Sequence, residues 1–137
     1  MTIDRDRQMI DRAKQMALAA TSWFTQAELA NSANKLPSEI EPYLLEWKSS
    51  GMIFSVLHEG AELFPSYAFD HDELRPVEEL KPILSLFANK KDDWGVAYWF
   101  ASLNGYLGGM CPQEMLQVDP KRVFKAAENE IAGIIHG

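Results

Sequence analysis

The spacing of apolar residues predicts three helices in the first third of the chain. Over about residues 4–20, apolar residues recur at helical spacing: Met9, Ala13, Met16, Ala17 and Ala20. Residues 25–28 (Thr-Gln-Ala-Glu) and 38–41 (Ser-Glu-Ile-Glu) are capping boxes, in which a hydroxyl and a carboxylate three residues later satisfy free backbone N–H groups. They predict the starts of the second and third helices, and Gly51 suits the end of the third.

Residues 52–67 predict a β-hairpin. Two apolar segments, residues 52–57 and 62–67, flank the turn sequence His-Glu-Gly-Ala at 58–61. Pro65 predicts an edge strand, because proline has no N–H for a neighbouring strand. Three helices followed by a hairpin is the element order of a winged helix-turn-helix, and the helices that begin near Thr25 and Ser38 would form its helix-turn-helix.

The polar segment at residues 69–76 separates this region from a second half that is helical throughout. Apolar residues at helical spacing, with a kink expected at Pro82, predict a helix over about 77–87. Asp92 or Asp93 would cap the next helix, and Asp119-Pro120 would begin the last one. We therefore expect a mainly α protein with a small β-hairpin, divided into a winged helix-turn-helix-like domain at residues 1–70 and a helical domain at residues 76–137.

Composition narrows the class of protein. The chain has 137 residues, of which 47% are hydrophobic and 24% are charged, and this excludes a disordered or collagen-like chain. No apolar stretch is long enough to span a membrane, and the charged N-terminus lacks the apolar region of a secretory signal. A single cysteine excludes an internal disulfide. The sequence thus predicts a cytoplasmic protein without membrane contact.

The charge distribution leaves DNA binding uncertain. Thirteen Lys and Arg residues stand against twenty Asp and Glu residues, a net charge of −7, and neither half of the chain is basic. A DNA-facing third helix needs basic or amide side chains, but it carries Glu39, Glu41 and Glu46 against Lys48. The candidate DNA contacts are Lys35, Lys48 and Ser49. A winged fold used for protein contact is the alternative interpretation.

No pattern indicates catalysis, a metal or a cofactor. The acidic run at residues 70–73 fits no metal motif and is typical of a solvated linker. Cys111 has no paired base in the local sequence, which favours a structural thiol. Gly108-Gly109 lacks the spacing of a phosphate loop and predicts a tight turn with positive φ. The sequence therefore predicts a protein that is not an enzyme.

Aromatic residues are concentrated between positions 94 and 106. Trp94, Trp99 and their aromatic neighbours cannot all point the same way on one helix, so some would build the core and the rest an interaction surface. The last four residues, 134–137, are apolar for a free end and would dock on a helix or on a partner.

The second half resembles a known family. Six residues fit the pattern W-x4-N-x2-L-x-G-x2-P-x3-L: Trp99, Asn104, Leu107, Gly109, Pro112 and Leu116. This pattern resembles the toxin-binding domain of Xre-, MbcA- and ParS-type antitoxins, and a V-x3-A helix follows at residues 123–127. Residues 64–70 are similar to the segment that precedes this domain in winged members. The resemblance covers about residues 22–132.

The resemblance implies an antitoxin-like protein-binding module. Such proteins bind a RES-domain toxin that degrades NAD and block access to its active site; they often form a homodimer, and many repress their own operon. The family motif residues, together with Trp94, are therefore the candidate partner-binding residues. The alternative function is a winged-helix transcription regulator that represses its own operon.

Overall fold

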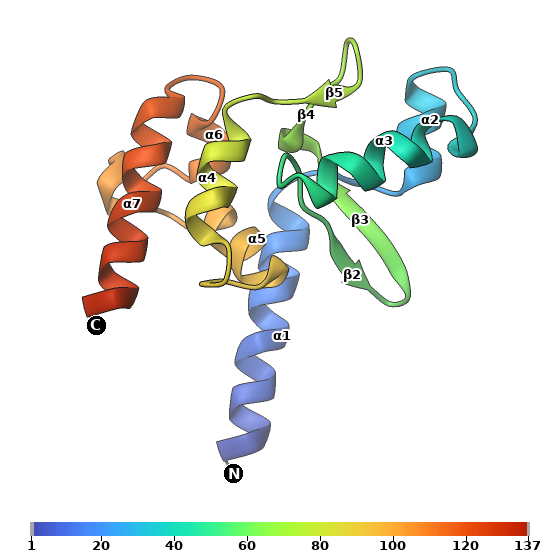
Figure 1. The fold of residues 1–137 in the computed structure, drawn as a ribbon. Coiled ribbons are helices and arrows are strands. Elements are labelled where there is room, and N and C mark those ends of the chain that lie inside the picture. The colour runs from blue at the N-terminus through green and yellow to red at the C-terminus, as the bar shows by residue number, and fades with distance from the viewer. Residues whose placement is uncertain (1, 137) are drawn as a thin grey trace.

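The computed structural model describes the backbone of residues 2–136 and the side chains of residues 4–134. Within this range the chain is mainly helical with a small antiparallel sheet, as Figure 1 shows. The helices are α1 (Thr2–Ala20), α2 (Gln26–Ser32), α3 (Pro37–Ser49), α4 (Leu80–Phe87), α5 (Asp93–Ala101), α6 (Pro112–Met115) and α7 (Pro120–His136), with 3-10 turns η1 (Ser66–Ala68) and η2 (Gly105–Leu107). The strands are β1 (Trp23–Phe24), β2 (Val56–His58), β3 (Ala61–Pro65), β4 (Phe69–Asp70) and β5 (Arg75–Pro76).

Capping side chains define where α2 and α3 begin. The predicted box at Thr25 is confirmed: the Glu28 N–H donates to the Thr25 hydroxyl at 3.2 Å, and the Thr25 N–H donates to the Glu28 carboxylate at 2.9 Å. The second helix start lies earlier than predicted. The Leu36 N–H donates to the Glu39 carboxylate at 2.9 Å, and Pro37 occupies the first helical position, so Ser38 is not the cap.

The predicted hairpin is confirmed, but its place in the sheet is not. His58 pairs with Ala61, so the turn consists of Glu59 and Gly60, whose φ angles are 50° and 81°. Two positive φ angles match the twist of a hairpin. However, the strand order is β1-β3-β2, which makes β3 central. Pro65 is tolerated because it is the last residue of β3, opposite Trp23 of β1.

The polar segment between the two halves is folded rather than extended. Strands β4 and β5 pair as a second, two-stranded sheet, with the turn at residues 71–74 between them. The Asp72 N–H donates to the Asp70 carboxylate at 3.0 Å, and the His71 ring N–H donates to the Ser66 carbonyl at 2.8 Å. These bonds hold the turn against η1, so the segment is ordered, while residues 71–73 are exposed to solvent as predicted.

The helical second half follows the predicted starts. The Asp92 carboxylate accepts the Gly95 N–H at 2.7 Å at the start of α5, and Pro120 is the first residue of α7. Pro82 lies in the first turn of α4, where its missing N–H has no intrahelical partner to lose. The kink expected there is therefore not required.

One hydrophobic core joins the two predicted domains. Phe54, which precedes β2, and Tyr67 of η1 both stack on Phe100 of α5, with ring centroids 6.3 and 5.0 Å away. Helix α1 packs chiefly on α5, and the Gln113 side-chain amide of α6 donates to the carbonyl of Ala20 at 2.7 Å (Figure 1). Side chains from both sides of the predicted boundary at residues 70–76 therefore pack in one core.

Two buried donors are left without partners in the described part of the chain, the Tyr67 hydroxyl and the Trp99 indole N–H. Burial raises the pKa of the Tyr67 hydroxyl well above its ordinary value. A buried polar group without a partner loses its hydrogen bonds to water, so the core gains from these rings only through their apolar surface.

Candidate protein-binding surface

The family-motif residues build a tight turn between α5 and α6. The Asn104 carbonyl accepts the Gly109 N–H at 2.9 Å, and its side chain accepts the Tyr106 N–H at 2.9 Å. The φ angles of Gly108 and Gly109 are 67° and 85°. The predicted turn with positive φ is confirmed, and these glycines provide a backbone conformation that side chains disfavour.

The apolar motif residues lie in the core. Trp99 has 5% of its surface exposed, and Leu107, Pro112 and Leu116 are also buried. The Trp99 ring meets Phe87 of α4 edge-on, with centroids 4.9 Å apart. These side chains contribute to the packing of α4, α5 and α6, and their burial keeps them from the protein surface.

Trp94 is the accessible aromatic residue of the predicted set. It is half-buried at the start of α5, with the Lys14 ammonium of α1 5.3 Å from its ring centroid and the His58 ring edge-on at 6.2 Å. A hollow of about 330 Å³ lies beside it, lined by Ile10, Ala13, Lys14, Asp92, Trp94, Gly95 and Tyr98. A groove thus lies beside Trp94, while Trp99 lies beneath the surface.

A second hollow adjoins the first, and Ala13 and Tyr98 line both. It measures about 220 Å³ and is lined by Met9, Arg12, Ala13, Met16 and Tyr98. The exposed fractions of Met9 and Tyr98 are 62% and 43%. We call the apolar residues around the two hollows the α1–α5 surface: Met9, Ile10, Met16, Trp94 and Tyr98.

The contribution of α1 to this surface was not predicted. The helical spacing of its apolar residues indicates a buried stripe, yet Ala17 is the one member of that stripe in the core. Met9 and Met16 are exposed, and both line the hollow beside Tyr98 of α5. The N-terminal half of α1 also extends beyond the end of α5 (Figure 1). Periodicity shows which residues share a face, and it does not show how far the partner helix reaches.

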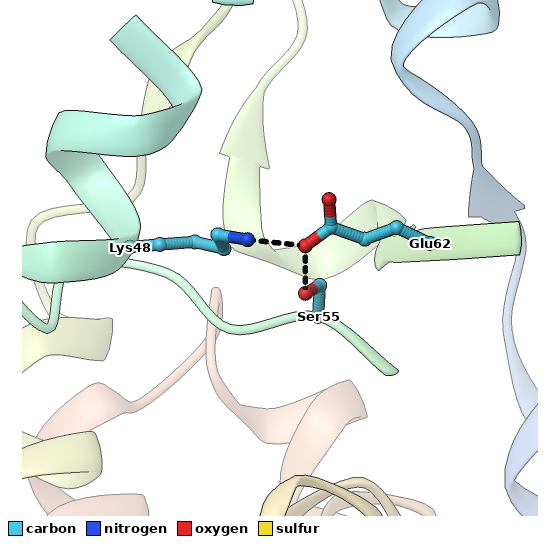
Figure 2. Close-up of polar contacts among 3 residues, drawn as sticks. All are labelled: Lys48, Ser55 and Glu62. Carbon is cyan, nitrogen blue, oxygen red and sulfur yellow. Dashed lines mark hydrogen bonds and ion pairs between the residues drawn. The ribbon is translucent and has the colours of Figure 1, made fainter. Parts of the chain in front are cut away.

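Of the three candidate DNA contacts, Lys48 and Ser49 already bind other groups of the protein, and Lys35 is exposed. The Lys48 ammonium of α3 is paired with the Glu62 carboxylate of β3, which also accepts the Ser55 hydroxyl at 2.5 Å (Figure 2). The Ser49 hydroxyl donates to the Glu46 carbonyl at 3.0 Å, and Lys35 is exposed in the α2–α3 connection. Lys48 therefore braces α3 against the hairpin.

The Lys48–Glu62 pair also shapes the local charge. Burial alone would raise the pKa of Glu62, but the hydrogen bonds from Lys48 and Ser55 and the Lys48 charge outweigh it and lower this pKa. The nearby Asp93 carboxyl has a raised pKa, because burial and the charges of Asp92 and Glu62 exceed the attraction of Lys48. The charge of Lys48 therefore acts on two carboxyl groups, Glu62 and Asp93.

The basic residues near the predicted helix-turn-helix do not form one patch. Lys14 lies over Trp94, Lys48 is paired with Glu62, and Lys35 lies beyond α2. The N-terminal half of α1, which carries Arg5 and Arg7, points away from α2 and α3 (Figure 1). A duplex resting on α3 would therefore meet few free cations.

A third hollow lies between α4 and α7. It measures about 580 Å³ and is lined by Glu79, Pro82, Pro120, Lys121, Phe124, Lys125 and Glu128. Further along α7, Ile134 is exposed, which does not support the predicted docking of the chain's last residues. The side chains of Ile135 and His136 and the whole of Gly137 lie outside the described residues.

The remaining candidates for reactive or metal-binding chemistry are the Cys111 thiol and the acidic and histidine side chains. The Cys111 thiol donates to the Ala101 carbonyl at 3.3 Å, and burial together with Glu114 raises the pKa of this thiol, which disfavours the thiolate. Over residues 4–134, no three His, Cys, Asp or Glu side chains are grouped to hold a metal ion. Among the helices of the described chain, none has the length and apolar character to cross a bilayer.

Comparison with known proteins adds no relative. No protein-family model, no curated protein and no solved structure matches this chain.

Proposed function

We propose that this chain is a non-catalytic protein-binding module of the antitoxin type, which neutralises a RES-domain NAD-degrading toxin by binding it. The observation that carries the proposal is the α1–α5 surface, where Trp94 and Tyr98 border two adjoining hollows among exposed methionines. The six residues of the pattern at 99–116, which resemble the toxin-binding domain, begin with Trp99 of α5, the helix that also carries Trp94 and Tyr98.

The composition of this surface suits a protein partner. Trp and Tyr bury a large area at low entropic cost and are enriched at the centres of interfaces. Methionine side chains are flexible and adapt to an irregular partner surface. Lys14, Arg12 and Asp92 surround the apolar centre, as polar residues do at the rim of an interface. The same surface on a second copy would support a homodimer.

A winged-helix transcription regulator is the second candidate function. Its support is the element order, since α2 and α3 are followed by the β2–β3 hairpin and β1 adds a third strand. The acidic character of α3 and the pairing of Lys48 with Glu62 favour the protein-binding function over this one.

Co-expression with a RES-domain toxin encoded beside this chain tests the proposal. Because α1 packs on α5, a chain ending at Asp70 would lose the helix that supports α1, so point variants are the better tool. We expect the full chain to restore growth and co-purify with the toxin, and Trp94→Ala combined with Tyr98→Asp to abolish both.

Val118→Asp is the matched control, since Val118 is exposed in the α6–α7 connection, away from the α1–α5 surface. This variant should neutralise the toxin as the unmodified chain does. Full rescue by the Trp94/Tyr98 variant would place the toxin contact elsewhere, and failure of the unmodified chain to rescue growth would reject the antitoxin function.

A further inference from the structure

The solvent face of α3 combines apolar and acidic side chains in one band. Leu36, at the N-cap, and Tyr43 are 64% and 56% exposed. Each is followed three residues later by an exposed glutamate, Glu39 and Glu46, and residues three apart are neighbours on a helix surface. The band therefore alternates an apolar side chain with a carboxylate along the length of α3.

A pocket lies beside this band, between α3 and the β4–β5 turn. It measures about 210 Å³ and is lined by Lys35, Ile40, Tyr43, Trp47, Glu73 and Leu74. The Tyr43 and Trp47 rings lie 5.9 Å apart at an angle of 39°, so they form an aromatic wall facing the turn. The pocket offers an apolar wall and floor with charged groups at its edge.

The charge on this face indicates the chemistry of its ligand. Lys48, the one lysine within α3, is paired with Glu62. At the pocket itself the charge of Lys35 is offset by that of Glu73, so Glu39 and Glu46 leave this face with a net negative charge. Negative carboxylates repel nucleic-acid phosphates and attract a partner that carries Lys or Arg.

We propose that α3 and the β4–β5 turn form a docking site for a basic segment of another protein. A large apolar side chain of that segment fills the pocket between Tyr43, Trp47 and Leu74. Its Lys or Arg residues lie against Glu39 and Glu46. This site is distinct from the α1–α5 surface, which is built on other helices (Figure 1).

Selection from a library of random peptides on the immobilised full chain tests this proposal. We expect the enriched peptides to be basic, to contain a large apolar residue, and to bind less tightly as salt rises. Tyr43→Ala combined with Glu46→Lys should weaken their binding about tenfold or more. Leu45→Ala combined with Glu41→Lys changes the same residue classes on the opposite flank of α3 and should leave the affinity unchanged.

Several outcomes would overturn the proposal: no enrichment, enrichment of peptides without basic residues, equal effects of the two variants, or competition by a DNA duplex for the same face. Glu46→Lys alone guards against misfolding, because the Glu46 side chain makes no hydrogen bond or ion pair within the described residues. Trp94 and Tyr98 are unchanged in all these variants, so a failure here leaves the toxin-binding test independent.

Discussion

The Phe54 ring stacks on the Phe100 ring, with centroids 6.3 Å apart and an angle of 17° between the ring planes. Phe54 precedes the hairpin, whereas Phe100 belongs to α5, on the other side of the predicted domain boundary. Tyr67 stacks on the same ring at 5.0 Å. The two halves of the sequence therefore meet through buried aromatic side chains.

We expect Phe100→Ala to destabilise the whole chain. Phe100 is fully buried, and truncating such a side chain removes its apolar surface and leaves a cavity, which costs about 3–5 kcal/mol. Denaturant unfolding followed by both tryptophan fluorescence and circular dichroism should show a single transition at lower denaturant concentration. If residues 1–70 unfold separately, with an unchanged midpoint, the shared core would be contradicted.

Tyr67→Phe provides the control for this experiment. It keeps the stacking on Phe100 and removes a hydroxyl that has no partner within the described residues. The free energy of unfolding should stay the same or rise by up to about 1 kcal/mol, because an unsatisfied polar group is removed. A clear loss of stability would show that the hydroxyl is bonded after all.

Gly109→Ala should destabilise the turn between α5 and α6. At a φ of 85° a side chain is strained even though the space around Gly109 is open. We expect a loss of about 1 kcal/mol in the free energy of unfolding. Gly133→Ala is the matched control, since Gly133 lies in α7 with open space around it and alanine there should stabilise the helix. Equal effects of the two substitutions would argue against strain at Gly109.

DNA binding by the isolated chain should be weak. The acidic side chains of α3 and the pairing of Lys48 with Glu62 leave few cations to replace the counterions of a duplex. A fluorescence anisotropy titration against its own promoter at physiological salt should give no specific complex. A salt-sensitive Kd below about 10⁻⁸ M, the range of specific binders, would support the regulator function instead.

The Lys48–Glu62 pair should make stability depend on pH in the acid range. Because the folded chain lowers the pKa of Glu62, its carboxylate stabilises the fold above the ordinary glutamate pKa of about 4.3, and this contribution is lost as pH falls through the lowered value. Thermal unfolding from neutral pH downward should show a smaller acid-induced loss for Glu62→Gln than for the unmodified chain. Parallel pH profiles would show that the pair contributes nothing, as is common for exposed ion pairs.

Local sequence signals were sufficient for most helix starts and for the β2–β3 hairpin, but not for the start of α3 or for strands β1, β4 and β5. The Thr25 box, the Asp92 cap, the Gly60 turn and the Gly108-Gly109 turn act within a few residues, so the side chains that direct them are neighbours in the sequence. For the same reason, the sequence alone determined a mainly helical chain with one hairpin, and the acidic character of α3.

Only the tertiary structure decided where these elements meet. The central place of β3 depends on pairing with β1, and the exposure of Met9 depends on how far α5 extends along α1. The pairing of Lys48 with Glu62 joins residues from different elements, so no local pattern predicts that this lysine is occupied. The α1–α5 surface and the pocket at Tyr43 likewise arise from segments distant in sequence, because a hollow exists only once two elements have packed beside each other.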